Sequence, residues 1–326
     1  MSDRNRNVIG VVVLVVAAAL LPYIVGEYWV GIGTEAAIFA IVALGLNVLI
    51  GLGGLVSVGH AGLFAASAYA TSLAQQRLDL DFVTSGLVAI TVTLLITAVF
   101  AVAAVRTTGM YFLMITLAAG MLVWGLAHRW SSLTGGENGS VSGVRPGGLT
   151  RYYQYYWVVL AVLVVVALLL WAFQRSPAGM RVRATRDSAA RMTSLGYSPA
   201  GQRFVAFLVS GAVTGVAGVL YAGYYPVVSP STAHLSMSIL FMLMVIAGGS
   251  AVFLGPAVGA VVLTVLRAAV SAETARWATV MGVILVAVVL FAPEGITGTV
   301  RDRLRPRRDP DPPVAVREPV TAQGQR

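Results

Sequence analysis

The sequence predicts an all-α, polytopic membrane protein with about ten transmembrane helices. Charged residues make up 11% of the 326-residue chain, against about 25% in an average soluble protein. Apolar residues make up 58% of the chain, and the mean hydropathy is +0.84. A chain with so little polar surface needs lipid around most of its length.

Hydrophobic runs of about 20 residues are long enough to cross about 30 Å of hydrocarbon as helices. Polar residues and Gly or Pro breaks divide this chain into ten such runs. Glycines interrupt the third, eighth and ninth runs, and the turns beside them are short. The runs are residues 8–25, 34–51, 55–75, 82–105, 109–127, 156–174, 203–223, 231–249, 252–271 and 277–292.

The first run follows Arg4 and Arg6 and has the position of a secretory signal peptide. It is longer than a usual signal core, and no small-x-small cleavage site follows it. We therefore expect a retained first span.

The basic residues, all of them Arg, predict the orientation. Ten spans place both termini on one side, and that side holds sixteen of the 22 arginines. The positive-inside rule therefore predicts cytoplasmic termini. The same distribution accounts for the net charge of +9 without nucleic acid as a partner.

This topology divides the chain into an N-terminal segment (1–7), a transmembrane domain (8–300) and an Arg- and Pro-rich tail (301–326) that we expect to be disordered. Two loops stand out. Residues 128–155 form an outer loop rich in Gly, Ser and Thr, and residues 175–202 form the only long cytoplasmic loop.

No pattern predicts a bound cofactor or metal. The chain has no Cys, and His60, His128 and His234 are too far apart in sequence to form a metal-ligand pair on one helix. The Gly-rich stretch 135–139 lacks the Lys and the Ser or Thr of a P-loop. Any ATP must therefore be bound by another subunit.

Small residues at helical spacing predict close helix packing, because they let backbones approach each other in lipid. Static packing is the favoured interpretation. Glycine also permits helices to slide or break in a protein with two conformations. The glycines concerned are Gly211, Gly215 and Gly218 in one run and Gly255 and Gly259 in another.

Ionisable and polar side chains at membrane depth are functional hypotheses by default. His60 lies between Gly59 and Gly62, and its alternative role is a neutral side chain bonded to a neighbouring helix. For Asn47, contact between helices is the favoured role. Glu35 is expected to be solvated at the outer end of the second span.

Ser57 and His60 also admit an intramembrane hydrolase. A nucleophile elbow has Gly two residues before and two after its Ser, but these positions are Leu55 and Gly59 here. No Asp or Glu occurs from 36 to 76 to orient the imidazole. The hydrolase is therefore the less favoured alternative.

The loop 175–202 contains a predicted short helix. Asp187 is expected to cap it, and the helix runs through Ala189, Ala190 and Met192 to Leu195. Gly196 suits its C-terminal end. A capped surface helix with small and apolar residues between two spans is typical of a docking element.

Several motifs, in order, resemble one family. They are LGLNVL at 44–49, GLGGLVSVGHA at 51–61, YFLMITLA at 111–118, LTGGENG at 133–139, the stretch from GMR at 179–181 to SLGY at 194–197, and FAPEGI at 291–296. Together they resemble the LivM-type permease subunits of branched-chain amino-acid ABC importers.

The resemblance implies a half-pore in the cytoplasmic (inner) membrane of a bacterium. Such a subunit pairs with a second, related permease, two ATPases bind ATP on the cytoplasmic face, and an extracytoplasmic binding protein delivers the cargo. The resemblance places the ATPase contact at Arg186, Asp187, Ala189, Ala190, Arg191, Leu195 and Gly196. It places the binding-protein contact at Thr134, Gly135, Gly136, Glu137, Asn138 and Gly139.

We therefore expect import of a small apolar amino acid by alternating access. Weakly polar groups suit the pathway, because a conduit that held its cargo tightly would not release it. The candidate pathway residues are Asn47, Ser57, His60 and Thr116. The alternative cargo for the same importer is urea, a short amide, a nucleoside or a sugar.

Overall fold

The computed structural model describes residues 26–141, 152–273 and 295–304, together with positions 22, 279, 282 and 283. Apart from these four positions, the predicted first and tenth spans lie outside the described residues, as do the segment 1–7 and residues 305–326. The helices are α2 (Glu27–Asn47), α3 (His60–Leu78), α4 (Phe82–Ala104), α5 (Met110–Arg129), α6 (Ser131–Thr134), α7 (Tyr152–Arg175), α8 (Pro177–Asp187), α9 (Ala189–Ser194), α10 (Pro199–Tyr224), α11 (Leu235–Gly248), α12 (Gly255–Glu273) and α14 (Gly295–Leu304). Shorter elements are the π-helix η1 (Val48–Leu52), the 3₁₀ helices η2 (Gly136–Asn138) and η3 (Pro230–Ala233), and the antiparallel strands β1 (Ser140–Val141) and β2 (Val227–Val228).

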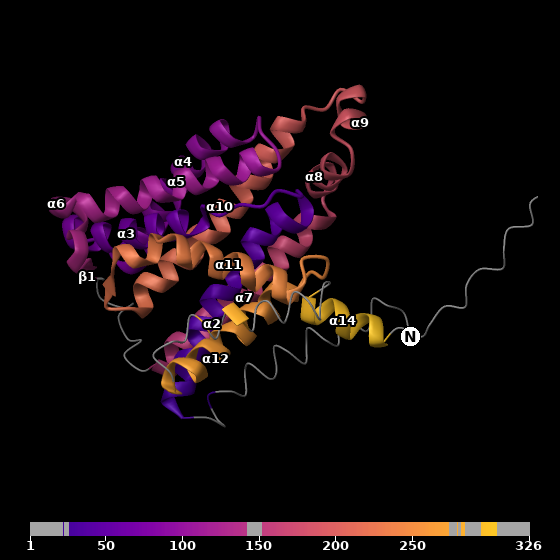
Figure 1. Ribbon diagram of the computed structural model, residues 1–326. Helices are drawn as coiled ribbons and strands as arrows, with labels where there is room; N and C mark the ends of the chain where they lie inside the picture. The colour runs from indigo at the N-terminus through magenta and orange to yellow at the C-terminus, as the bar shows by residue number, and fades with distance from the viewer. Residues whose placement is uncertain are drawn as a thin grey trace, which may run out of the picture.

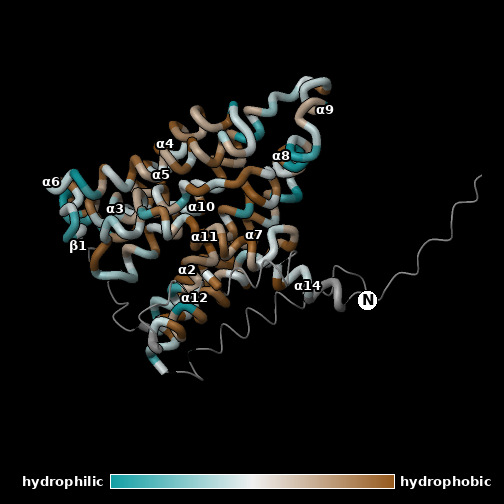
Figure 2. The backbone as a smooth tube through the Cα atoms, viewed as in Figure 1, coloured by the Kyte–Doolittle hydropathy of each residue, from teal (hydrophilic) through white to brown (hydrophobic). Residues whose placement is uncertain are grey.

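The long helices run between two polar ends. One end carries α8 and α9, and the other carries α6 and the β1–β2 pair (Figure 1). We call these the α9 end and the α6 end. Figure 2 shows hydrophobic residues along the helices and hydrophilic residues gathered at both ends. An apolar belt between two polar ends is the pattern of a multi-pass membrane protein.

Five helices in the described part of the chain are long and apolar enough to cross a membrane. They are Glu27–Leu52 (α2 with η1), α4, α5, α7 from Tyr153 and α10. The predicted runs at 231–249 and 252–271 correspond to the shorter apolar helices α11 and α12. α14 ends at Leu304, so helix continues past Arg301, where the tail was predicted to begin.

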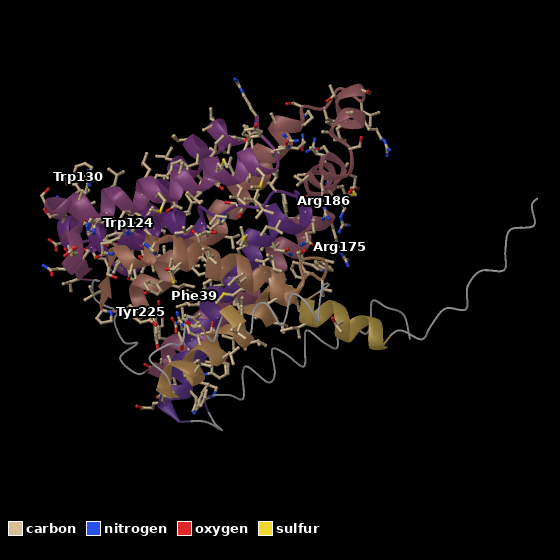
Figure 3. All side chains as sticks on the ribbon, in the orientation of Figure 1. Phe39, Trp124, Trp130, Arg175, Arg186 and Tyr225 are labelled. Carbon is tan, nitrogen blue, oxygen red and sulfur yellow. The ribbon has the colours of Figure 1, made fainter. Side chains whose placement is uncertain are left out.

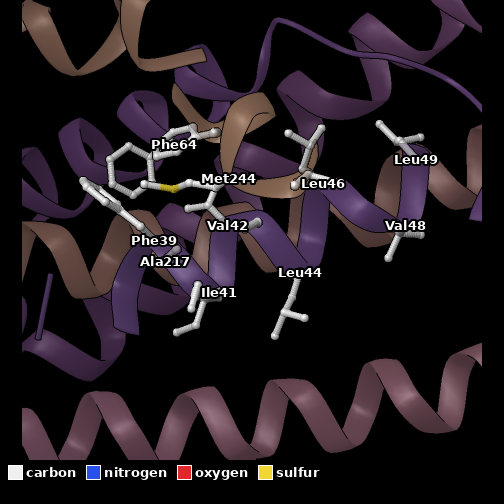
Figure 4. Close-up of a cluster of buried hydrophobic side chains, with 14 of the residues drawn as sticks. Phe39, Ile41, Val42, Leu44, Leu46, Val48, Leu49, Phe64, Ala217 and Met244 are labelled. Atoms are coloured by element: carbon white, nitrogen blue, oxygen red, sulfur yellow. The ribbon is translucent and has the colours of Figure 1, made fainter. Parts of the chain in front are cut away.

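α2 is the central helix and packs against α7, α10, α11 and α12. Every residue of α2 from Ala36 to Asn47 is buried, so it has no polar face. A helix that is apolar all round is buried. Figure 4 shows its side chains against Phe64, Ala217 and Met244. Phe39 lies edge-on to Phe241, with ring centroids 5.4 Å apart.

α4 has the opposite arrangement to a helix in a soluble protein. Its small and weakly polar residues are buried, and its large apolar residues are exposed. Thr93 and Thr97 face Gly215 and Gly211 of α10, so the two backbones approach closely. Each Thr hydroxyl donates to the carbonyl one turn earlier. Asp81 caps the helix, and a hydrogen bond from the Thr84 hydroxyl lowers the pKa of its carboxyl.

The third span was predicted to begin at 55, but α3 begins at His60. Gly54 has a φ of 65°, which breaks the helix after η1, and residues 55–59 are non-helical. Their backbone donors find partners inside the bundle: the amide of Leu55 donates to Leu49 O at 2.9 Å, and that of Val58 to Thr116 Oγ1 at 3.3 Å. Irregular backbone at this depth requires such partners.

The predicted cap of the loop helix was wrong. Asp187 is the last residue of α8, and Ser188 caps α9 by accepting from the amide of Arg191 at 3.2 Å. The sequence did not predict α8 (Pro177–Asp187), which precedes the loop helix. Pro177 is the first helical residue, and Ser176 caps it. The cap of the loop helix therefore lies one residue later than predicted.

Gly196 ends α9 as expected, with a φ of 82°. The amide of Gly196 donates to Thr193 O at 2.9 Å, and that of Tyr197 donates to Met192 O at 3.0 Å. These two bonds form a Schellman motif, which satisfies the last carbonyls of the helix.

The turn between α11 and α12 is also close-packed, like the contact between α4 and α10. Cβ atoms at Gly255 and Gly259 would meet backbone atoms of Gly249, Gly248 and Met244. The Thr297 hydroxyl of α14 donates to Gly248 O. Only glycine therefore fits where these helix ends cross.

Candidate functional site

A buried chain of hydrogen bonds surrounds His60 at the start of α3. Ser57 Oγ lies 3.0 Å from His60 Nδ1, and His60 Nε2 lies 2.7 Å from Ser210 Oγ of α10. Ser210 Oγ donates to Gly45 O of α2 at 2.7 Å. The side chains of Ser57, His60 and Ser210 are 0% exposed. We call these three side chains and the Gly45 carbonyl the His60 network.

The bond directions in the His60 network follow from the number of protons available. Ser210 uses its only proton on Gly45 O, so it must accept from His60 Nε2–H. His60 Nδ1 is then the acceptor for the Ser57 hydroxyl. The chain runs in one direction from Ser57 to Gly45, and the imidazole is neutral with both nitrogens satisfied. This matches the neutral, helix-bonded role that the sequence left open for His60.

Thr116 of α5 joins the same region from the other side. Its hydroxyl accepts from Val58 N and donates to Leu113 O at 3.0 Å. A Cβ on Gly59 would clash with the Thr116 carbonyl, so α5 lies directly against the broken segment. The amide of Ala61 donates to Ser238 Oγ of α11 at 3.1 Å. The break before α3 is therefore connected to α2, α5, α10 and α11.

Asn47 lies at the end of α2, two residues beyond Gly45, and is 4% exposed. In the described part of the chain its Oδ1 has no hydrogen-bond partner. The structure thus places Ser57, His60 and Thr116 together, and Asn47 lies two residues along α2 from the Gly45 carbonyl that accepts from Ser210. All four candidate pathway side chains are buried between helices in this conformation.

The Ser57–His60 pair has the separation of a nucleophile and its base. The group on the far side of the imidazole is Ser210 rather than a carboxylate, and Ser57 is fully buried. A triad base needs an orienting acid, and a nucleophile needs access for its substrate. The geometry therefore supports a structural network rather than a hydrolase.

The loop helices α8 and α9 form the tip of the α9 end (Figure 1). Arg191 is exposed, Met192 is buried, and Leu195 is 66% exposed. Ala189 is half-buried, and Asp187, Ala190 and Gly196 are exposed. The α9 region thus presents an exposed apolar residue, Leu195, beside an exposed cationic side chain, Arg191.

Arg186 connects this loop to the break before α3. Its Nη1 donates to Gly51 O in η1, and a Cβ on Gly54 would lie 2.8 Å from Arg186 Cγ. Figure 3 labels Arg186 at the α9 end of the molecule, where α8 lies. This contact joins residues 135 positions apart in the sequence, and spacing alone does not reveal it.

The loop 134–139 lies at the α6 end and divides into buried and exposed residues. Thr134 donates from its hydroxyl to Ala127 O at 2.6 Å and is buried, as is Gly136. Gly135, Glu137 and Asn138 are exposed, and Gly139 is half-buried against β2. Glu137 lies 3.7 Å from His128 Nε2.

Glu35 was expected to be solvated, and this is wrong. Arg267 Nη2 of α12 lies 2.5 Å from Glu35 Oε1, and the Glu35 side chain is only 14% exposed. Arg267, Ser210 and Ser238 were not among the predicted site residues. The signal for Arg267 was a single charge inside an apolar run. Ser210 and Ser238 gave no comparable signal, since Ser is common in membrane helices.

Comparisons with known proteins identify relatives along most of the chain. A family model described as "Branched-chain amino acid transport system / permease component" matches residues 28–292. The high-affinity branched-chain amino acid transport system permease protein LivM of Escherichia coli K12 is 28% identical over 325 residues, which cover 90% of this chain and 76% of that protein. LivM of Salmonella typhimurium LT2 is 28% identical over 323 residues, which cover 90% and 75%. No solved structure matches the chain.

Proposed function

The chain belongs to the family of branched-chain amino acid transport system permease components, and from this premise we propose that it is a membrane subunit of an ABC importer for branched-chain or other small apolar amino acids. The observation that carries the proposal is the family match over residues 28–292. The relatives named LivM support the cargo class. The protein is thus a transport component and not an enzyme.

The proposed complex has four further components. A second, related permease completes the pore, two ATPases bind and hydrolyse ATP, and an extracytoplasmic binding protein delivers the amino acid. The α9 end would face the cytoplasm and the ATPases, and the α6 end, with Glu137 and Asn138 exposed, would face the binding protein. The complex would lie in the cytoplasmic membrane of a bacterium.

The contacts of Arg186 suggest how ATPase movement reaches the pathway. A shift of α8 and α9 would pull on Gly51 through Arg186. Gly51 lies in the π-helix η1, and the non-helical segment 53–59 follows directly. Short irregular segments of this kind often act as hinges. This segment ends at His60, whose bonds reach α10 and α2. Movement of the hinge would therefore change the packing of α2 against α10.

ATP-dependent uptake tests the proposal. The permease is reconstituted in proteoliposomes with its related permease, the ATPases and the binding protein. We expect uptake of labelled leucine, isoleucine or valine that stops without ATP. Uptake of urea, a short amide, a nucleoside or a sugar, without any amino acid, would replace this cargo by the alternative one.

A further inference from the structure

A cleft of about 660 Å³ opens at the α6 end of the bundle, between α2, α10 and α12. Small-molecule sites have volumes of about 300–1,000 Å³, so the cleft is large enough for a metabolite. Its walls come from the first turns of α2, the end of α10 and the last part of α12. The lining residues that matter here are Tyr28, Ile32, Glu35, Tyr224, Tyr225 and Arg267. Figure 3 labels Tyr225 and Phe39 in this part of the molecule.

The cleft contains a pair of opposite charges at membrane depth. Glu35 follows Glu27 by eight residues, which is about 12 Å along the helix. Its carboxylate pairs with Arg267 at 2.5 Å and is hydrogen-bonded by Tyr225. The Arg267 guanidinium also lies 5.6 Å from the centre of the Phe39 ring. Charges at such depth are costly, and they usually mark a ligand or ion pathway.

The chemistry of the two side chains matches one class of ligand. A guanidinium carries five N–H donors and binds carboxylates in a fork, while a carboxylate has two oxygens that accept from an ammonium group. A zwitterion carries one carboxylate and one ammonium group. Its carboxylate can pair with Arg267 and its ammonium with Glu35, so binding adds no net charge to the cleft. Ile32 and the Tyr28 and Tyr224 rings line the same cleft and suit an aliphatic side chain.

We infer that this cleft binds the α-ammonium and α-carboxylate groups of a free amino acid on its way into the pathway, with Arg267 on the carboxylate and Glu35 on the ammonium. The inference rests on the proposed function and adds a binding site in this subunit. A zwitterionic lipid head group, such as phosphoethanolamine, shares this chemistry. The cleft is assigned to the free amino acid because its walls provide aromatic and aliphatic surface next to the charges.

The test measures leucine binding to the complex of permease and ATPase subunits in nanodiscs, without the binding protein. Saturation-transfer NMR detects weak binding, and the competitors are leucinamide, which lacks the carboxylate, and 4-methylpentanoate, which lacks the ammonium. We expect leucine to bind and neither competitor to displace it at equal concentration. If either competitor displaced leucine as well as unlabelled leucine does, this result with the wild-type complex alone would overturn the inference.

Charge-neutral variants give the second measurement. Glu35→Gln and Arg267→Gln should each weaken leucine binding at least tenfold, with a matching rise in the leucine concentration needed for uptake. Asp79→Asn and Arg129→Gln make the same changes at exposed positions of the α6 end outside the cleft, and they should bind leucine like wild type. Size-exclusion profiles show which variants fold.

Four results would overturn the inference or separate it from the proposed function. Unchanged leucine binding in both folded cleft variants overturns it. Retention of phosphatidylethanolamine by wild type but not by the variants, with no leucine binding in any lipid, assigns the cleft to lipid and also overturns it. A wild-type complex that imports leucine but does not bind it here overturns the cleft site alone, whereas a complex that imports no amino acid overturns the proposed function.

Discussion

The contact between Gly62 of α3 and Gly120 of α5 predicts the effect of one added methyl group. In Gly62→Ala the new Cβ would lie 2.9 Å from Gly120 Cα and 3.3 Å from Gly120 O. Carbon atoms in ordinary contact are about 3.5–4.0 Å apart, so the helices must separate by roughly 0.6–1 Å. Both nearby atoms belong to the backbone, so no side-chain rotation relieves the clash.

The expected change in the free energy of unfolding has three parts. Overpacking costs about 1–3 kcal/mol. Separation of α3 from α5 also weakens the neighbouring bond from Val58 N to Thr116 Oγ1, at about 0.5–1.5 kcal/mol. Replacing a helical Gly by Ala returns about 0.5–1 kcal/mol. The net loss is therefore about 1–3 kcal/mol.

The assay is thermal unfolding of the purified permease. At about 2–4 °C per kcal/mol, Gly62→Ala should lower the midpoint by roughly 2–12 °C. Gly125→Ala on α5 is the matched control, because no described atom lies within 4 Å of its added Cβ. The control should keep or slightly raise the midpoint. Equal midpoints for the two variants would refute the close approach of α3 and α5.

Three further predictions concern the loop and the His60 network. Arg186→Ala should leave ATP hydrolysis intact and reduce uptake at least tenfold, because it removes the hydrogen bond to the Gly51 carbonyl in η1. The control Arg106→Ala, at an exposed position of the same end, should transport like wild type. Equal uptake by the two variants would refute the role of this contact in the hinge. Ser188→Ala should cost about 1 kcal/mol of α9 stability and speed amide hydrogen exchange in α9, whereas Asp187→Ala should do neither. Faster exchange in Asp187→Ala than in Ser188→Ala would show that Asp187 is the cap. Ser210→Ala leaves His60 Nε2–H and Gly45 O without their partner, which should destabilise the fold by about 1–3 kcal/mol for each group. An unchanged melting curve would contradict the hydrogen-bond directions assigned to the His60 network.

Hydropathy predicted the long helices well, because lipid imposes a minimum apolar length on each of them. The observed α4 and α5 begin and end within two residues of the predicted runs at 82–105 and 109–127. The start of α3 was missed because a glycine-rich apolar stretch satisfies the same length criterion without being helical. Hydropathy measures transfer to lipid, and it does not detect a φ of 65° at Gly54.

The site was only partly predictable. Its unusual residues, His60 and Ser57, stand out in a membrane span, but their partners do not. Ser210 lies 150 positions from His60, and its role depends on how α10 packs against α3. The same holds for Glu35 and Arg267, 232 positions apart. Each charge was visible in the sequence, and only the packing of α2 against α12 shows that they neutralise each other.

The inverted pattern of α4 has a consequence for how this chain tolerates mutation. On its outer face, exchanging one bulky aliphatic residue for another changes little, since hydrocarbon adapts to any shape. On its inner face, tolerance depends on volume: an alanine or threonine replaced by leucine would force α10 away. A saturation-mutagenesis profile of this helix should therefore rank substitutions by size on one side and by charge on the other.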